Sequence, residues 1–528
     1  MLKMSEDLGP VKTHPMGERN EGAVEVLEGG SSLDTFAGKI HLRWVDGAAV
    51  SSMGQMPYFI EFLKTSGRFD ELVKECPLSF TSPNAPRKRD VLGTMLLSVL
   101  AGHWRYAHMN SVRGDGVNPE LLGMKKVCSE DSVRRAAKAM AGPTSEPWLK
   151  KQLKDSYEPL LDEPWILDVD TTVKLLYGHQ EDARVGYNPT KPGRPSHSLH
   201  SYFIANIRIA VDVEVQAGNQ TASSFAQPEL WSFLDGLPKE KHPSFLRGDS
   251  AWGTERAMEA AEQRQIPFLF KLKQSANVRR LAERLLGKDG WAEAGQGWQG
   301  MESKLRLSGW SNTRRVVVLR RPLPERTAEK ARKAARRQEA KQLTLDLNEA
   351  LHRGERYEYA VLVTSLKDEA LSIAQHYRDR ADSENNFDEL KNQWGWGGFT
   401  TQDQKRCQLM ARFTALIYNW WTIFMRLGIP DKHAEAITSR PLALQGIARM
   451  TRHANQTTVE VTSTHSMAAL ITKALETVSG LLHQIKTKAV AEQLTLTAKW
   501  SLIPSAAFQY FLRGTILGST ARLAPTTG

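Results

Sequence analysis

Four polar side chains near residue 380 have the spacing of one helix face. Tyr377, Arg380, Glu384 and Lys391 read Y-x2-R-x3-E-x6-K within residues 370–393, a segment with a helical pattern. At about 3.6 residues per turn, the four side chains fall within an arc of about 60°. An acid between two bases is costly to bury without partners, and a metal ion with a nucleic-acid phosphate would supply them. The alternative is an ordinary salt-bridged amphipathic helix.

Two acidic positions upstream favour the metal site. Asp170 lies in residues 165–177, which we expect to form a central strand ending in acids, and Asp168 shares its face. Asp249 ends a later short strand, where open α/β sheets hold ligands. Together with Glu384, these carboxylates suit two Mg²⁺ ions, which activate an attacking water or 3′-hydroxyl in phosphoryl transfer. Taken singly, an acid at a strand end is usually a solvated cap.

Size and charge indicate a multidomain protein with a polyanionic partner. The chain has 528 residues, and one core rarely serves more than about 250–300. A net charge of +11 and a pI near 9.4 favour nucleic acid as that partner. Several of the 14 tryptophans lie beside Arg or Lys, a mixture suited to stacking on bases.

The cysteines and apolar segments bear on localisation. Cys76, Cys128 and Cys407 have no CxxC spacing, which argues against a disulfide framework or a zinc site and fits a reducing cytoplasm. Residues 1–22 have no apolar stretch, so we expect no secretion signal. The apolar run at 413–425 is too short to cross a bilayer and is expected to be a buried helix, so we expect no membrane partner.

The N-terminal region, residues 1–150, is expected to be helical and to bind DNA after a loosely ordered start of about 35 residues. A helix after a Ser129 cap would present three basic side chains: Arg134, Arg135 and Lys138. Lys125 and Lys126 precede it. A short helix, a turn and this basic helix favour a helix-turn-helix DNA reader, whereas the alternative is a solvated helix face.

Strands and helices alternate from residue 165, which indicates a mixed α/β sheet. Within this pattern the Pro/Gly loop at 187–197 carries Lys191, Arg194 and His197. The expected domains are a sheet core at 151–274 and 357–430, an insertion at 275–356, and a helical C-terminal region at 431–528 that could mediate dimerisation.

The expected insertion combines strands, tryptophans and a strongly basic helix at 325–342. Trp298 is our first choice for a residue that stacks on a DNA base, followed by Trp291 and Trp310. The alternative for each tryptophan is a place in the core of the insertion.

These motifs resemble those of the DDE transposases of bacterial insertion sequences, in the branch whose third acid lies in a Y-R-E-K signature. The four residues at 377–391 match that signature spacing without a gap. Asp170, followed by two threonines and LYGHQ, is similar to the first-aspartate segment, and Asp249 in LRGDSAWG is similar to the second. The resemblance covers roughly residues 90–430. The loop at 187–197 also looks like the subgroup in which the element can carry neighbouring genes.

The resemblance implies an RNase H-like catalytic core with a β-rich insertion. It implies an Mg²⁺-dependent endonuclease and polynucleotidyl transferase, active in DNA recombination, that cleaves transposon ends and joins them to target DNA. Asp170, Asp249 and Glu384 would bind two Mg²⁺ ions, for which Mn²⁺ could substitute, and Asp168 could compete for the first position. Their partner would be double-stranded DNA, bound by a homodimer in the bacterial cytoplasm at the nucleoid.

The phosphate backbone near the cut end would be held by three residues of the signature: Tyr377, Arg380 and Lys391. Two other functions remain open at this point. One is a nuclease of the same fold that transfers no strand. The other is a catalytically silent DNA-binding protein derived from a transposase.

Overall fold

A computed structural model describes residues 30–322 and 357–509. Isolated positions within these ranges are excepted: 46, 81, 143, 144, 189, 190, 206, 223, 224, 226 and 463–465. The basic helix predicted at 325–342 and most of the loosely ordered N-terminal start lie outside the described residues. The chain divides into two compact units, residues 1–49 and 50–528.

The first unit contains a β-hairpin. Strands β1 (Gly30–Thr35) and β2 (Gly38–Arg43) pair antiparallel, and Gly38 at the turn has a φ of 103°, which favours glycine. The prediction of a loosely ordered start up to about residue 35 is wrong for residues 30–35, which form a paired strand.

The second unit opens with helices, as the apolar periodicity predicts. Their bounds are α1 Met56–Ser66, α2 Arg68–Glu75, α3 Lys88–Leu100, α4 Asn118–Leu121, α5 Glu130–Met140 and α6 Ser145–Tyr157, with 3₁₀ turns η1 Tyr106–Gly114 and η2 Glu158–Asp162. Ser129 caps α5 as expected, because its hydroxyl accepts from the Ser132 N–H at 3.3 Å.

A ten-stranded mixed sheet follows, in the order β10-β11-β12-β13-β9-β8-β4-β6-β5, with β7 paired to β6. Its strands are β4 Ile166–Leu175, β5 Arg184–Val185, β6 Pro195–Ile204, β7 Ile209–Ala217, β8 Phe245–Gly248, β9 Phe268–Lys271, β10 Ala292–Glu293, β11 Gln299–Leu305, β12 Arg314–Pro322 and β13 Tyr357–Thr364. Strands β4, β8 and β9 run parallel, and β13 joins β9 antiparallel. The mixed α/β class is thus confirmed, and the strands of the expected insertion continue the core sheet. The helices between these strands are α7 Gln227–Asp235, α8 Glu255–Gln263 and α9 Ala276–Leu286, with the 3₁₀ turn η4 Lys239–Lys241.

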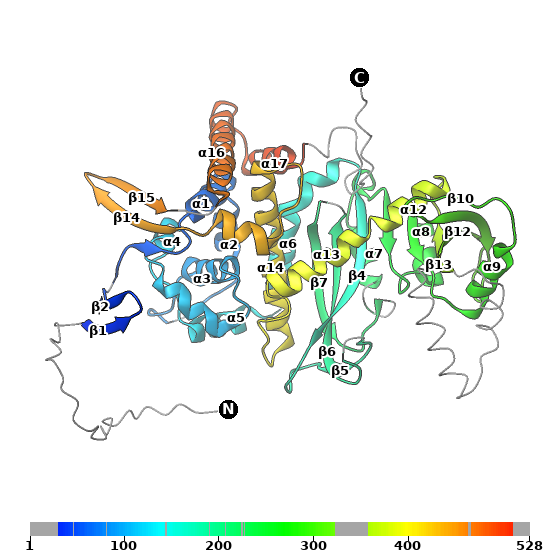
Figure 1. Cartoon of the computed structure of the whole chain (residues 1–528), viewed down its shortest axis with the longest axis horizontal. Helices are drawn as coiled ribbons and strands as arrows, with labels where there is room; N and C mark the ends of the chain where they lie inside the picture. The colour runs from blue at the N-terminus through cyan, green and yellow to red at the C-terminus, as the bar shows by residue number, and fades with distance from the viewer. Residues whose placement is uncertain are drawn as a thin grey trace. The chain divides into compact units, whose positions relative to one another are not determined.

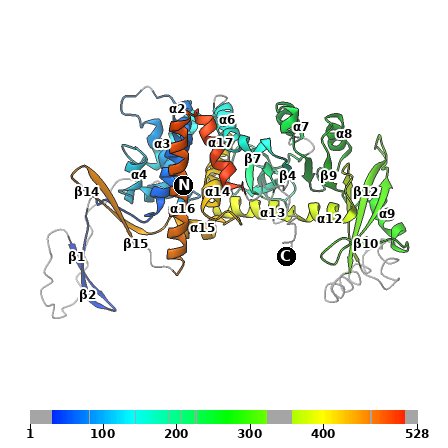
Figure 2. The same cartoon turned by 90° about the horizontal axis from the view of Figure 1, so that it is seen from above.

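The long helix expected at 370–393 is broken into pieces. They are α12 (Ala370–Arg378), α13 (Ala381–Asp388) and the π-turn η5 (Glu389–Gln393). Figure 2 shows α12 and α13 in yellow, one after the other along the sheet. Helix α13 contacts β4, whereas α12 contacts β10, β11 and β12. The helices therefore connect the strand of Asp170 with the strands of the insertion.

Helix α14 (Gln404–Gly428) contains the apolar run at 413–425, which is buried as predicted. It packs against β7, as Figure 1 shows. Asn419 in this run is satisfied by backbone groups of Ala210 at 2.8 Å and by the Ser156 hydroxyl at 2.9 Å. Within the described residues, no helix has the length and apolarity that a membrane span needs.

The C-terminal region continues with α15 (Ala436–Ala443), α16 (Ala468–Ala491) and α17 (Leu496–Ala507). The prediction that this region is wholly helical is wrong. Strands β14 (Ile447–His453) and β15 (Gln456–Thr462) form a hairpin, and β14 also pairs with β3 (Val50–Ser51). Asn455 in the turn has a φ of 63°, a left-handed conformation that Asn tolerates.

Candidate active site

Asp170 lies in the middle of β4, not at its end, because the strand continues to Leu175. The neighbouring strand β8 pairs with β4 only as far as Val169 opposite Gly248. The carboxylate of Asp170 therefore comes just beyond the point where β8 leaves the sheet. It accepts the Thr171 N–H at 2.7 Å and forms an ion pair with Arg380.

The surroundings of Asp170 disfavour its charge. Burial raises the pKa of Asp170 to about 6, and the nearby carboxylate of Asp249 adds to the rise, while Arg380 opposes it. A positive partner is thus needed to hold this carboxylate ionised. Arg380 supplies it, and the acids in turn raise the pKa of Arg380 above its ordinary value against the effect of burial.

Asp249 is the first residue after β8. Its carboxylate accepts the Ala251 N–H at 2.9 Å, which fixes the side chain in the turn. The preceding Gly248 is needed there, since a Cβ at that position would lie 2.8 Å from the Trp252 side chain. The backbone therefore passes close to Trp252 directly before Asp249.

Glu384 projects from α13 with 74% of its side chain exposed, and its carboxylate lies 3.8 Å from Arg380. Arg380 itself is buried at the break between α12 and α13. Its N–H donates to the Tyr377 carbonyl at 3.1 Å, a tighter turn than an α-helix makes. This break brings one guanidinium into reach of both Asp170 and Glu384.

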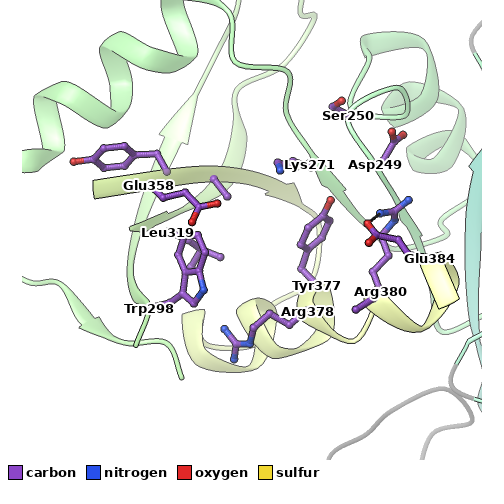
Figure 3. A pocket seen from close by; sticks show the side chains of 13 residues that line it. Asp249, Ser250, Lys271, Trp298, Leu319, Glu358, Tyr377, Arg378, Arg380 and Glu384 are labelled. Atoms are coloured by element: carbon purple, nitrogen blue, oxygen red, sulfur yellow. Dashed lines mark ion pairs between the residues drawn. The ribbon is translucent and has the colours of Figure 1, made fainter. Parts of the chain in front are cut away.

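A cleft of about 420 Å³ lies beside these groups, and Asp170 is not among the residues that line it. Asp249, Tyr377, Arg380 and Glu384 all line it. In Figure 3, Asp249 and Glu384 lie on one side and Trp298 on the other, with Tyr377 between them. Burial raises the pKa of Tyr377 to about 12, so its hydroxyl stays protonated and can donate a hydrogen bond.

Lys391 does not belong to the set that lines this cleft. It lies in the π-turn η5, and its Cγ is 3.7 Å from where a Cβ on Gly397 would stand. The expectation that all four signature residues share one helix face therefore differs from the structure, because a helix break and a π-turn both change the angular spacing.

The three tryptophans of the expected insertion have different surroundings. Trp298 lines the cleft, and the Arg321 guanidinium lies 4.7 Å from its ring. Trp291 donates to the Leu285 carbonyl at 3.2 Å, and Trp310 is buried in the core. Trp310 is a core residue, and Trp291 and Trp298 are partly buried against the core. Of these three tryptophans, Trp298 is the one that lines the cleft.

Asp168 is bound by a neighbouring arginine. Its carboxylate forms a bidentate ion pair with Arg247, at 2.5 Å to Nε and 2.7 Å to Nη2, and both residues are buried. A carboxylate held in this way is poorly placed to compete with Asp170 for a metal.

The predicted DNA-binding residues on α5 divide into two kinds. Arg135 and Lys138 are exposed, whereas Arg134 pairs with Glu130 at 2.6 Å and stacks 4.7 Å from the Tyr106 ring. The structure therefore leaves Arg135 and Lys138 more accessible to a phosphate than Arg134.

The loop between β5 and β6 carries a basic and aromatic cluster. Lys191 donates to the Tyr177 hydroxyl at 2.9 Å, and the Arg194 guanidinium lies 4.6 Å from the same ring. The hydrogen bond from Lys191 lowers the pKa of Tyr177. His197, predicted in this loop, belongs to strand β6 instead. It is buried there, and its Nε2 lies 2.8 Å from the Glu181 carbonyl oxygen.

Sequence reasoning missed several residues of the site. Lys271 and Arg378 also line the cleft. Arg247 forms the ion pair with Asp168. Lys271 is the last residue of β9, the strand beside β8. The rule that open α/β sheets hold ligands at strand ends, which indicated Asp249, could therefore have indicated Lys271 as well. Arg247 gave no signal, because a charged residue two positions before an acid has no distinctive pattern.

The three acids fit a hard divalent cation in kind, since carboxylate oxygen is the preferred ligand of Mg²⁺. Across residues 30–322 and 357–509, no three acidic, histidine or cysteine side chains are grouped closely enough to hold an ion. In this structure the guanidinium of Arg380 interacts with both Asp170 and Glu384.

A family model described as Transposase DDE domain group 1 matches residues 39–482, which is most of the chain. No curated protein matches the sequence. A solved structure described as the cryo-EM structure of piggyBac transposase synaptic complex with hairpin DNA is similar at a TM-score of 0.39 and 10% identity. That similarity covers 86% of this chain and 85% of the other, and at this level it carries no inference. The family match includes the three acids and the cleft, and the chain belongs to the group 1 family of transposases with a DDE domain.

Proposed function

We propose that this transposase cleaves the ends of a bacterial insertion sequence and joins them to target DNA, with Asp170, Asp249 and Glu384 as its catalytic acids. The observation that carries the proposal is that all three acids interact with Arg380. Asp249 and Glu384 line one cleft, and Arg380 joins Glu384 to Asp170. The acids come from strand β4, the residue after strand β8 and helix α13, which lie far apart in the sequence. We propose that these elements form an RNase H-like core.

The three carboxylates would hold two Mg²⁺ ions, or Mn²⁺ in their place. Bound there, the ions lower the pKa of an attacking water or 3′-hydroxyl and stabilise the leaving oxygen. For the chain's own groups, this requires Arg380 to leave Asp170, and the natural new partner for its guanidinium is a DNA phosphate.

The DNA end would lie along the cleft and the loops beside it. Tyr377 and Arg380 would hold phosphates there, and Lys391 would act further along the same segment. Trp298 lines the same cleft as Asp249 and Glu384 and would offer a surface for one unstacked base, with stacking worth about 1–3 kcal/mol.

The double-stranded partner, comprising terminal repeats and target DNA, would also contact basic residues away from the cleft: Arg135 and Lys138 on α5, with Arg134 behind them, and Lys191 and Arg194 in the β5–β6 loop. We propose a homodimer on DNA, since two ends must be cut and joined together. The site of action would be the bacterial nucleoid.

Alanine at each acid tests the proposal. Asp170→Ala, Asp249→Ala or Glu384→Ala should abolish Mg²⁺-dependent cleavage of terminal-repeat DNA while leaving its binding close to normal. Affinity comes mainly from Lys and Arg on phosphates, whereas the carboxylates serve the chemical step. Asp388→Ala is a matched control, because Asp388 is exposed on the same helix and does not line the cleft.

Cleavage would be measured on labelled DNA in sequencing gels, and binding by gel shift. Robust cleavage by purified Glu384→Ala protein would exclude the proposed mechanism. A strand-joining assay with a pre-cut end separates a transposase from a nuclease, and a wild-type protein that binds but never cleaves would be a silent DNA-binding protein.

A further inference from the structure

One buried ion pair joins the strand of Asp170 to the strand that precedes Asp249, and it also contacts helix α12, which leads to the helix of Glu384. Asp168 and Arg247 lie directly opposite each other on the parallel strands β4 and β8. The guanidinium is fully buried and engages the carboxylate with Nε at 2.5 Å and Nη2 at 2.7 Å. Two residues further along each strand stand Asp170 and Asp249. The pair therefore fixes the register of the two acid-bearing strands next to the acids.

The third nitrogen of the same guanidinium reaches the helix that leads to Glu384. Nη1 of Arg247 donates to the backbone carbonyl of His376 in α12. In an unbroken helix this carbonyl would accept from the N–H of Arg380, but that N–H turns to Tyr377 instead. The break between α12 and α13 thus leaves one carbonyl without its helical donor, and Arg247 replaces it.

A second contact from the same strand supports this attachment. Phe245 shares a face of β8 with Arg247, and its ring lies 5.2 Å from the His376 ring, edge to face. His376 is consequently held by its backbone and by its side chain. It stands one residue before Tyr377 and four before Arg380, so a shift of His376 would move both.

We propose that Asp168 and Arg247 are positioning residues that set the distances between the three catalytic acids through this shared contact. The proposal rests on the proposed function, since it takes these acids as the ligands of the divalent ions. A buried ion pair is a poor way to gain stability alone, because apolar residues of similar volume often do as well. The pair lies two residues before Asp170 and Asp249, where it can set the positions of these acids. Catalysis is sensitive to misplacement of such groups by about 1 Å.

The test compares substitutions of this pair with a matched buried pair outside the site. Arg247→Lys and Asp168→Asn keep charge or shape while losing the bidentate geometry. Arg412→Lys is the control, because Arg412 is also buried and pairs with Asp212 at 2.7 Å between α14 and β7. A double variant, Asp168→Leu with Arg247→Met, removes both charges together, so no unpaired charge remains if a single variant fails to fold.

Four measurements on the full chain distinguish positioning from stability: the melting temperature, DNA affinity, Mn²⁺ binding followed by electron paramagnetic resonance, and single-turnover cleavage at saturating DNA. The control should lose melting temperature alone. Arg247→Lys and Asp168→Asn should keep DNA affinity and lose Mn²⁺ affinity or cleavage rate on the order of 10–100-fold, the range seen when a ligand loses its support. In the double variant the melting temperature should recover, whereas Mn²⁺ affinity should stay low.

Folded variants that keep wild-type Mn²⁺ affinity and cleavage rate would overturn the proposal, and so would an equal loss in Arg412→Lys. If the wild-type protein does not cleave, the proposed function fails. The Mn²⁺ measurement then still decides whether Asp168 and Arg247 set the spacing of the acids.

Discussion

The guanidinium of Arg380 pairs with the carboxylate of Asp170 and lies 3.8 Å from that of Glu384. One positive group therefore stands between two acids that belong to different elements of the fold. In this position it offsets the repulsion between negative charges in a partly buried site. If Asp170 binds a divalent ion, as proposed, Arg380 and the ion would compete for the same carboxylate.

Replacing Arg380 by Gln should consequently have opposite effects on two properties. Mn²⁺ affinity of the DNA-free protein should rise by roughly tenfold or more, because a close positive charge is worth about 1–3 pKa units to a carboxylate. Cleavage of terminal-repeat DNA should fall, because a phosphate contact is lost. Arg378→Gln is the control: Arg378 also lines the cleft, but its guanidinium donates to Gln375 at 2.8 Å. Unchanged Mn²⁺ affinity in Arg380→Gln would contradict the competition.

Trp298→Ala should impair the handling of the cut end and spare the first nick. If the cut end closes as a hairpin, a base must leave the stack, and the Trp298 ring would offset about 1–3 kcal/mol of that cost. Hairpin formation and resolution should therefore slow, and 2-aminopurine placed at the terminal base should show reduced unstacking.

Trp291→Ala is the matched control for this experiment. Trp291 also stacks against an arginine, with Arg320 3.9 Å from its ring, but it does not line the cleft. Equal slowing of nicking and of hairpin formation in Trp298→Ala, or an equal effect of Trp291→Ala, would count against base stacking.

The strands that carry the first two acids could be predicted from sequence, because branched apolar residues flank Asp170 and Asp249 and turn residues separate the segments. The helix break at Arg380 could not. No Gly or Pro marks it, and the donor that satisfies the His376 carbonyl comes from Arg247, 129 positions away in sequence. Local patterns cannot report a contact of that range.

Two further features show how far local sequence patterns reach. The β14–β15 hairpin gave a readable signal, since Thr and Val alternate with polar residues in Gln456–Thr462 and Asn455 suits the turn. The choice among the three tryptophans had no such signal. Trp298 lies between Gly and Gln and Trp310 between Gly and Ser, and only the packing of the sheet separates the cleft from the core.

On helix α5, Arg135→Ala and Lys138→Ala should each weaken binding to terminal-repeat DNA. Each phosphate contact that is lost should lower the salt dependence of binding by about one unit of slope. Arg134→Ala should change this slope less, because Arg134 is engaged with Glu130 and Tyr106. Gel shifts over a range of salt concentrations would measure the three slopes. Unchanged slopes for Arg135→Ala and Lys138→Ala would move the DNA-binding surface away from α5.

The stability of the fold should depend on pH through His200, which is buried on β6 with its ring nitrogens 2.9 Å from the Thr171 hydroxyl and 3.1 Å from that of Ser198. Burial lowers the pKa of His200 from 6.5 to about 4, so the folded protein favours the neutral ring. Its stabilising effect is full above pH 6.5 and is lost as the pH falls from 6.5 to about 4, because the unfolded chain binds the proton first. The loss would approach roughly 3 kcal/mol at pH 4.

Urea unfolding of wild type and His200→Gln at matched pH values would isolate this contribution, since the other titrating groups are common to both. Wild type should lose more free energy of unfolding than the variant between pH 7 and pH 4, and parallel curves would show that His200 titrates normally in the folded state.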